Sequence, residues 1–351
     1  MCRHLGYLGP PTPVGDLLTR GDHSLRTQAW APRDMRGGGT INADGFGVAW
    51  WAPAPGRETE NIGARAHGGP LDGRGSGGAP TSAAGSVTTR YRNPAPIWSD
   101  PAVDEVLPQL NSHAVLAAVR SATVGMPVER TACAPFTHGR WAFSHNGVIQ
   151  DWQATLTAVA ARFDAPPLIE AESRTDSATF WVILRGLLDR EADRNVAEPA
   201  PAARTHSAPD VRAHSAPGAR AESARDDRAG SARDVPGDIG ATGNVEVLSP
   251  SPARQPDRVA AILREAALAV LVHAPNARLN LLLGDGETLW ATTVHHALSV
   301  LVTEEIAVIA SEPYDDDPRW RAIPDRRLVT ARPGTLTVAP LDPDESERPT
   351  S

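Results

Sequence analysis

The sequence contains no lysine, and all 34 of its basic side chains are arginine. Pyridoxal-phosphate enzymes, Schiff-base aldolases, Walker-A nucleotide hydrolases and Ser–Lys dyads all need an amine side chain, so these classes are excluded. The formal net charge is −8, and the arginines are spread along the chain rather than gathered in a basic stripe. We therefore expect no nucleic-acid partner.

Cysteine is scarce, and long apolar runs are absent. The two cysteines, Cys2 and Cys133, are too few for a disulfide framework, and Cys133 is interpreted as a small buried hydrophobe because small residues surround it. No apolar run reaches the roughly eighteen residues that predict a membrane-spanning helix. The first residues also lack the apolar segment of a signal peptide. The sequence thus favours a cytoplasmic protein without a membrane partner.

One of the two cysteines directly follows the initiator methionine. If an aminopeptidase removes Met1, Cys2 carries a thiol and a free α-amine on the same carbon atom. A free thiol has a pKa near ~8.5 and an α-amine titrates near ~7.7–8.0, so the amine can take the thiol proton and later return it to a leaving amine. Met1-Cys2 is therefore a candidate nucleophile and general base in one residue, although a small residue can also follow the start codon by chance.

Apolar segments outline two blocks of strands with helices between them. The first block of strands is predicted at 5–8, 46–51, 86–91, 113–119 and 141–144, and prolines at 10, 11 and 13 are expected to end its first strand. Helices are predicted at 14–20, 24–30, 102–111, 151–163, 175–194 and 256–273. The second block of strands is predicted at 278–283, 288–293, 297–302, 306–310, 327–331 and 335–339. This order predicts an α+β fold of stacked layers rather than a doubly wound sheet.

Two segments are too poor in large apolar residues to form a core. Residues 53–85 are predicted to form an exposed loop, and residues 195–255 are rich in Ala, Pro, Ser and Arg. The second segment cannot bury enough apolar surface to offset its ordering entropy, so we expect a disordered insertion. The expected organisation is a single domain in two parts, residues 2–194 and 256–341, with a flexible tail over 342–351.

Amide cleavage needs more than a nucleophile. Asn146 and Gly147 follow an apolar strand, where Asn-Gly indicates a tight turn, and they could donate hydrogen bonds to the oxyanion of a tetrahedral intermediate. Arg120 could hold a carboxylate and Asp176 an ammonium group. A group with both charges is an amino acid, so with its side-chain amide at Cys2 the substrate would be a γ-glutamyl amide.

Four motifs in this order resemble the class II glutamine amidotransferase domain. They are Met1-Cys2, Val119-Arg120-Ser121-Ala122-Thr123-Val124-Gly125, Ser144-His145-Asn146-Gly147-Val148-Ile149 and Thr175-Asp176-Ser177. The resemblance implies an N-terminal-nucleophile hydrolase with a four-layer αββα sandwich. It also implies Cys2 as nucleophile and base, Asn146 and Gly147 as the oxyanion hole, Arg120 for the α-carboxylate, Asp176 for the α-amine, and Thr123 in the glutamyl pocket. Ser121 and Val124 depart from the aromatic residue and the histidine of the members that make amino sugars.

The chain has no segment for the ammonia-consuming domain that such enzymes usually carry, so a stand-alone hydrolase is expected. Three stretches resemble the γ-glutamyl hydrolases of ergothioneine biosynthesis, namely residues 1–9, 36–47 and 311–320. That resemblance implies cleavage of γ-glutamyl-hercynylcysteine sulfoxide to glutamate and hercynylcysteine sulfoxide. A glutaminase subunit of a two-chain amidotransferase, a peptidase for glutathione-like substrates and a non-enzymatic scaffold are the alternatives.

No metal or organic cofactor is expected. The adjacent pair His295-His296 would point to opposite faces of a strand, so it is interpreted as structural rather than as a metal site. The expected partner is a small γ-glutamyl substrate. Contacts with a second copy of the chain or with a pathway enzyme are left open by the sequence.

Overall fold

The computed structural model describes residues 2–34, 41–53, 86–197 and 257–342. Met1, nearly all of the predicted loop over 53–85, nearly all of the predicted insertion over 195–255 and the tail from 343 lie outside the described residues. Residues 36–40 of the stretch 36–47 also lie outside them. The predictions made for these segments stay predictions.

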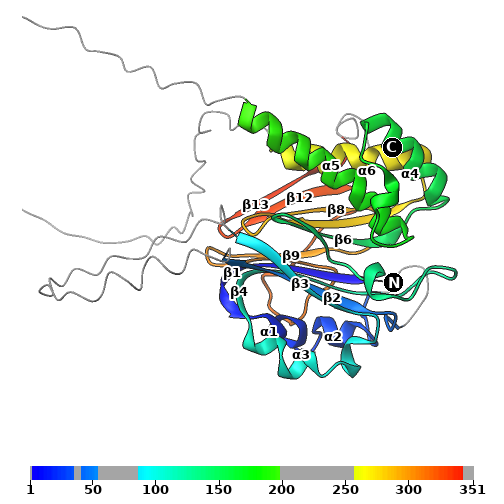
Figure 1. The fold of residues 1–351 in the computed structure, drawn as a ribbon. Helices are drawn as coiled ribbons and strands as arrows, with labels where there is room; N and C mark the ends of the chain where they lie inside the picture. Colours follow the sequence, from blue (N-terminus) through cyan, green and yellow to red (C-terminus); the bar gives the residue numbers. More distant parts are fainter. Residues whose placement is uncertain (1, 35–40, 54–85, 198–256, 343–351) are drawn as a thin grey trace, which may run out of the picture.

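Two antiparallel sheets stack face to face in the described part of the chain (Figure 1). The seven-stranded sheet has the order β11 (Arg321–Ala322), β9 (Ser299–Val302), β10 (Ala307–Ala310), β1 (Arg3–Pro13), β4 (Asn111–Val119), β2 (Phe46–Pro53) and β3 (Ser86–Asn93). The six-stranded sheet has the order β13 (Thr335–Pro340), β12 (Arg327–Arg332), β8 (Leu289–Thr293), β7 (Arg278–Gly284), β6 (Trp141–Val148) and β5 (Phe136–His138). β1 thus lies at the centre of its sheet, between β10 and β4.

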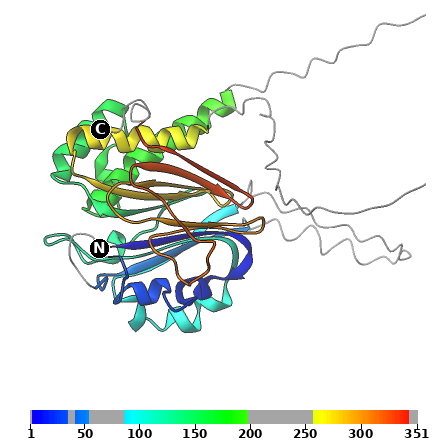
Figure 2. The same cartoon turned by 180° about the vertical axis from the view of Figure 1, so that it is seen from behind.

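Helices cover the outer face of each sheet. The short helices α1 (Val14–Thr19), α2 (Leu25–Gln28) and α3 (Ala102–Glu105) lie against the seven-stranded sheet, and α4 (Trp152–Phe163), α5 (Asp176–Ala197) and α6 (Arg258–His273) lie against the six-stranded sheet. Figure 2 shows the same order of layers from behind. The predicted four-layer αββα sandwich is therefore confirmed. No helix in the described ranges is long and apolar enough to cross a membrane.

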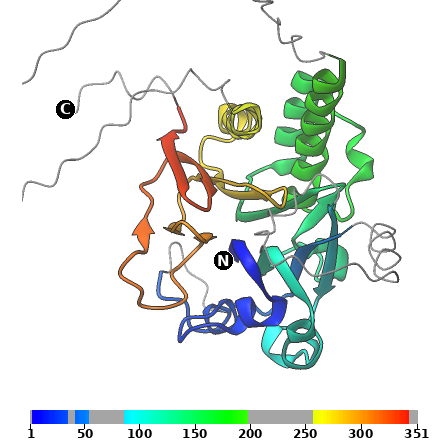
Figure 3. The same ribbon diagram turned by 90° about the vertical axis from the view of Figure 1, so that its left-hand side faces the viewer.

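Three apolar clusters hold the layers together. The side chains of β1 alternate between two of these clusters, which shows the direction in which each of them points. Leu5 and Tyr7 pack against the helical layer, whereas Leu8 packs between the two sheets. Because side chains alternate along a strand, Cys2 and His4 share the face of Leu8 and point toward the six-stranded sheet. Figure 3 shows β1, in dark blue, beginning near the centre of the molecule. A residue placed just before β1 is therefore presented between the sheets.

The strand and helix predictions hold for most elements and are wrong at three places. β1 does not end at the prolines but continues to Pro13, and its register with β4 shifts between Leu8 and Thr12. Pro10 and Pro11 thus occupy an irregular stretch where their missing N–H groups matter least. The helix predicted over 102–111 is split into α3 and a 3-10 turn, Leu107–Gln109, because Pro108 cannot continue an α-helix. The short strands β5 and β11 were not predicted.

The third error concerns Asn146-Gly147, which is not a turn. β6 continues through both residues to Val148 and pairs with β7, with Asn146 opposite Asn280 and Gly147 opposite Leu279. A β-carbon on Gly147 would lie 1.8 Å from the carbonyl oxygen of Arg278, so glycine is needed here for close strand approach rather than for a turn. The strand places Asn146 on the face that meets β1, as it does Ala142, which packs between the sheets.

Candidate active site

The first described residues are fixed by a buried ion pair. The Arg3 guanidinium donates through Nε to Glu312 Oε1 at 2.8 Å, and both side chains are at most 4% exposed. Glu312 also accepts hydrogen bonds from the backbone N–H groups of Arg33 and Asp34. Arg3 in turn donates to the carbonyl oxygen of Cys2 at 3.0 Å. The chain is thereby held in a defined position at Cys2.

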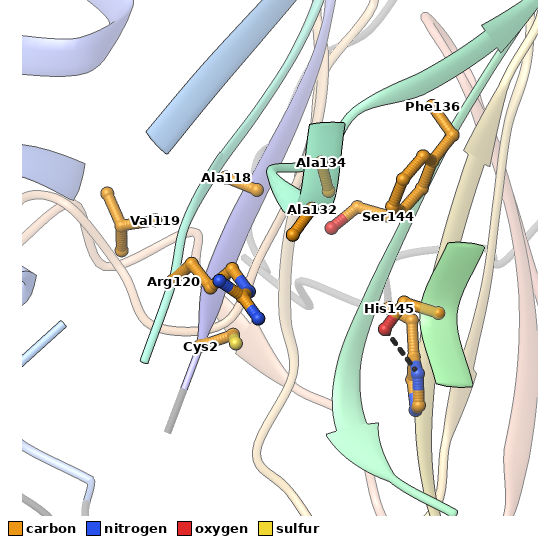
Figure 4. Close-up of a pocket in the computed structure, with 10 residues that line it drawn as sticks. Cys2, Ala118, Val119, Arg120, Ala132, Ala134, Phe136, Ser144 and His145 are labelled. Carbon is orange, nitrogen blue, oxygen red and sulfur yellow. Dashed lines mark hydrogen bonds between the residues drawn. The ribbon is translucent and has the colours of Figure 1, made fainter. Parts of the chain in front are cut away.

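Cys2 and Arg120 line the same cleft, which has an empty volume of about 320 Å³ (Figure 4). The cleft lies where the beginning of β1 meets the ends of β4 and β6. Its lining residues are Cys2, Ala118, Val119, Arg120, Ala132, Ala134, Phe136, Ser144, His145 and Ser177. Cys2 is half-buried, and its thiol donates to the carbonyl oxygen of Ser121 at 3.8 Å. Of the predicted site residues, the structure thus brings Cys2 and Arg120 together directly.

Arg120 is held in place by the protein. It follows β4, its backbone N–H donates to the carbonyl oxygen of Gly45 at 2.7 Å, and its guanidinium Nη1 donates to that of Pro127 at 2.9 Å. Asp44 fixes the next turn, because its carboxylate accepts the N–H of Ala122 at 2.7 Å. Figure 4 shows the guanidinium group extending toward Cys2. A cation beside a thiol can bind a substrate carboxylate or favour the thiolate form.

Asn146 lies on β6, and its side chain contacts the segment that follows β10. Its side chain is 1% exposed, Nδ2 donates to Ser311 Oγ at 3.4 Å, and Oδ1 has no hydrogen-bond partner in the described part of the chain. Ser311 Oγ also accepts the backbone N–H of His4, two residues after Cys2, at 3.0 Å. Asn146 and Gly147 do not line the cleft of Cys2 itself, but Ser144 and His145 of the same strand do.

Asp176 and Thr123, unlike Arg120, do not line the cleft of Cys2. Both carboxylate oxygens of Asp176 already accept backbone hydrogen bonds, from Ile149 at 2.9 Å and from Ser177 at 2.7 Å. The carboxylate thus joins the end of β6 to the beginning of α5, and Ser177, rather than Asp176, lines the cleft. Thr123 is exposed in the loop after Arg120 and does not line the cleft either.

Sequence reasoning missed His145 and Ser177 as neighbours of the nucleophile. His145 Nε2 lies 2.8 Å from the carbonyl oxygen of Arg278, which can only accept, so Nε2 carries a proton. Nδ1 lies 3.1 Å from Ser177 Oγ, which is itself 3.2 Å from Asp176 Oδ1. His145 directly precedes Asn146 and Ser177 directly follows Asp176 in the motifs described above. Their adjacency to these residues in the sequence was the one signal that could have predicted them as site residues.

His4, His296 and Cys133 are buried groups outside the cleft. Burial lowers the pKa of both His4 and His296 to about 3, so both imidazoles are neutral. His295 and His296 lie in the bend after β8, between the two predicted strands, with their ring centroids 5.1 Å apart. Burial raises the pKa of Cys133 to about 11, which keeps that thiol protonated and unreactive.

Comparison with known proteins identifies the family. No family model matches the chain. The γ-glutamyl-hercynylcysteine sulfoxide hydrolase of Mycobacterium tuberculosis is 32% identical, covering 97% of this chain and 97% of the relative; that of Mycolicibacterium smegmatis is 31% identical, covering 97% and 100%. The glutamine phosphoribosylpyrophosphate amidotransferase of B. subtilis shares the fold with a TM-score of 0.50 at 10% identity, covering 97% of this chain and 50% of that one. On this identity and coverage, the chain belongs to the family of γ-glutamyl-hercynylcysteine sulfoxide hydrolases.

Proposed function

We propose that the protein hydrolyses the γ-glutamyl amide bond of γ-glutamyl-hercynylcysteine sulfoxide, with Cys2 as the nucleophile. The observation that carries the proposal is the position of Cys2, which directly precedes the central strand and lines a cleft together with Arg120. The names and the near full-length coverage of the relatives support the substrate. The products are glutamate and hercynylcysteine sulfoxide.

The first half of the reaction forms a thioester on Cys2. Once Met1 is removed, the α-amine of Cys2 takes the thiol proton, and the thiolate attacks the γ-carbonyl carbon. Asn146 Nδ2 and the backbone N–H of Gly147 would donate to the resulting oxyanion. Collapse of this intermediate breaks the C–N bond, and the leaving amine takes the proton from the α-ammonium group. The glutamyl group stays on sulfur.

The second half releases glutamate. The α-amine of Cys2, now neutral, removes a proton from water as the water oxygen attacks the thioester carbonyl. Collapse breaks the C–S bond, and the thiolate recovers its proton from the α-ammonium group. Arg120 would hold the α-carboxylate of the glutamyl group throughout, Asp176 would bind its α-amine, and Thr123 would line the glutamyl pocket. All protons are exchanged between Cys2, water and the substrate.

Substitution of Cys2 tests the nucleophile. Cys2→Ala should lower glutamate release by at least about 10³-fold, because removal of a covalent nucleophile leaves only binding and oxyanion stabilisation. The matched control is Cys133→Ala, which removes the other, buried thiol and should keep turnover close to that of the wild type. Substantial turnover by Cys2→Ala would exclude the thioester route.

Processing and substrate choice need separate measurements. Intact-mass analysis should show that Met1 is missing, and a chain that retains Met1 should be inactive because its cysteine has no free amine. Glutamate release should then be compared for γ-glutamyl-hercynylcysteine sulfoxide, glutathione and glutamine. We expect the sulfoxide to have the highest kcat/KM; fastest release from glutamine would instead indicate a glutaminase.

A further inference from the structure

The pairing of β1 with β10 continues beyond the last residue of β10 through a side chain. Leu5 pairs with Ala310, so the next opposed residues are His4 and Ser311. The backbone N–H of Ser311 donates to the carbonyl oxygen of His4 at 3.0 Å, as in a regular antiparallel ladder. The N–H of His4, however, donates at 3.0 Å to the hydroxyl Oγ of Ser311. The serine side chain thus completes the pairing of the strand that begins directly after Cys2.

The same hydroxyl also contacts the opposite sheet. Asn146 on β6 donates through Nδ2 to Ser311 Oγ at 3.4 Å, and both side chains are at most 2% exposed. The two donors, the His4 N–H and Asn146 Nδ2, occupy both acceptor sites of the hydroxyl oxygen. Ser311 is therefore a link between β1, which follows Cys2, and the side chain proposed to bind the oxyanion.

β1 meets β6 beside this link. His4 Nδ1 lies 3.4 Å from Ser144 Oγ, and Ser144 is two residues before Asn146, so the side chains of Ser144 and Asn146 share one face of β6. Ser144 lines the cleft of Cys2, and Cys2 is two residues before His4. The junction of β1, β6 and the segment that follows β10 therefore sets the position of Asn146 relative to the nucleophile.

We propose that Ser311 is a positioning residue for the oxyanion hole and orients the Asn146 amide relative to Cys2. The inference rests on the proposed function and deepens it. An amide nitrogen carries two hydrogens, and Asn146 Nδ2 gives one of them to Ser311, which leaves the other for the oxyanion. An oxyanion donor is effective when it is already oriented before the charge develops. Ser311 acts through Asn146 and does not itself line the cleft of Cys2.

Removal of the Ser311 hydroxyl should lower kcat with little change in KM. Ser311→Ala should reduce kcat for glutamate release from γ-glutamyl-hercynylcysteine sulfoxide about tenfold, because Asn146 is still present but no longer oriented. KM should stay within about twofold of the wild type, because the hydroxyl serves the transition state rather than the bound substrate. Ser311→Thr keeps a hydroxyl group and should recover most of the lost kcat.

A double-mutant cycle with Asn146→Ala shows whether Ser311 acts through the amide. Asn146→Ala alone should lower kcat by roughly 10²–10³-fold, as the loss of an oxyanion donor does. Addition of Ser311→Ala to this variant should lower kcat by less than about a further twofold, because no amide remains to be oriented. Equal losses from Ser311→Ala in both backgrounds would mean that the serine acts independently of Asn146 and would overturn the inference.

Ser112 provides the matched control for a hydroxyl that serves the fold alone. It is also buried, and its Oγ likewise accepts a backbone N–H across the sheet, from Trp51 at 3.3 Å, but it pairs with Thr12 at the other end of β1. Ser112→Ala should lower the midpoint of urea unfolding, as Ser311→Ala should, yet keep the kcat of the wild type. A loss of kcat in Ser112→Ala equal to that in Ser311→Ala would assign the effect to general destabilisation and overturn the inference.

The remaining outcomes separate this inference from the proposed function. If Asn146→Ala is slow but Ser311→Ala keeps the kcat of the wild type, the positioning role alone is overturned. A Ser311→Thr protein as slow as Ser311→Ala would also overturn it, because packing rather than the hydroxyl would then matter. A wild type that releases no glutamate from the sulfoxide, or an Asn146→Ala protein with unchanged kcat, would contradict the proposed function and this inference with it.

Discussion

Arg120 is the residue whose removal separates binding from chemistry. Its guanidinium is already positioned by the Pro127 carbonyl oxygen, so little side-chain entropy is lost when a carboxylate binds. Arg120→Ala should raise KM roughly ten- to hundredfold, because a hydrogen bond to a charged group is worth about 1.5–3 kcal/mol, with a smaller effect on kcat. Arg120→Lys keeps the charge but lacks the planar guanidinium, so its KM should lie between those of the wild type and Arg120→Ala. Steady-state kinetics check this, with exposed Arg162→Ala as the control, and an unchanged KM would contradict the clamp.

A substitution at Gly147 should destabilise the fold rather than weaken substrate binding. A β-carbon there would meet the Arg278 carbonyl oxygen at 1.8 Å and His145 Nε2 at 2.5 Å, so two strands of the sheet would have to separate. Gly147→Ala should lower the free energy of unfolding by about 3 kcal/mol, at the upper end of overpacking costs. Gly139→Ala, where the added carbon has nothing within 4 Å, should cost only about 1 kcal/mol for its positive φ. Urea unfolding measures both, and equal losses would exclude strand separation as the cause.

At the scale of single residues, the sequence was a better guide to which residues belong to the site than to the contacts that each of them makes. Cys2 and Arg120 meet in one cleft, and both stand in short motifs next to strands. The motif around Asp176 could not reveal that both carboxylate oxygens accept backbone N–H groups, since one of these belongs to Ile149 on another element. Asn-Gly was assigned to a turn because local preference was considered without the partner strand β7. Cross-strand contacts are long-range, and no local pattern contains them.

Among the elements, α6 depends on one side chain that serves two layers. Asp257 accepts hydrogen bonds from the N–H groups of Val259 and Ala260 at the beginning of α6, and from the indole N–H of Trp290 on β8 at 2.8 Å. Asp257→Ala should therefore cost about 2 kcal/mol, the sum of a lost cap and a lost hydrogen bond of about 1 kcal/mol each.

Asp151 provides the matched control for this cap. It precedes α4 at φ 45° and makes no side-chain cap hydrogen bond, so Asp151→Gly removes a carboxylate without removing a cap and suits the positive φ. Urea unfolding of both variants should show a clear loss for Asp257→Ala alone. A comparable loss for Asp151→Gly would indicate that the charge, rather than the cap, stabilises these helices.

Elements with strong periodicity were predicted to within a few residues. α5 and α6 carry wide apolar faces that pack on the six-stranded sheet, and the hairpin of β12 and β13 turns at Pro333-Gly334, between the two predicted strands. β5 and β11 are too short to show alternation, so only their pairing with β6 and β9 makes them strands. Pro108 shows how one residue can divide a helix that composition alone suggests is continuous.

For the whole molecule, the stacked layers were predictable but the strand order was not. The order of strand blocks and helices along the chain is consistent with two sheets between two helical layers. The strand order is different, because β1 is inserted between β4 and β10, and β1 and β10 lie about 300 residues apart in the sequence. That central insertion matters for function, because it brings the chain's first residues between the sheets.

The stability of the whole molecule should depend on pH through two buried histidines, His4 and His296. Burial, the largest cause, lowers the pKa of His4 and of His296 from 6.5 to about 3. Between these values the unfolded chain binds protons that the folded protein does not, so the free energy of unfolding should fall as pH decreases from about 6.5 toward 3. Each imidazole should contribute roughly 1 kcal/mol per pH unit.

Urea unfolding between pH 4.5 and 6.5 tests this slope, with substitutions isolating the histidines from the carboxylates. His4→Gln and His296→Gln should each reduce the pH dependence of the unfolding free energy by roughly 1 kcal/mol per pH unit, because glutamine takes up no proton in either state. His273→Gln, at the exposed end of α6, is the control and should keep the wild-type slope. If both buried variants also keep it, the imidazoles are not held neutral by burial, and another group must set the acid sensitivity of the fold.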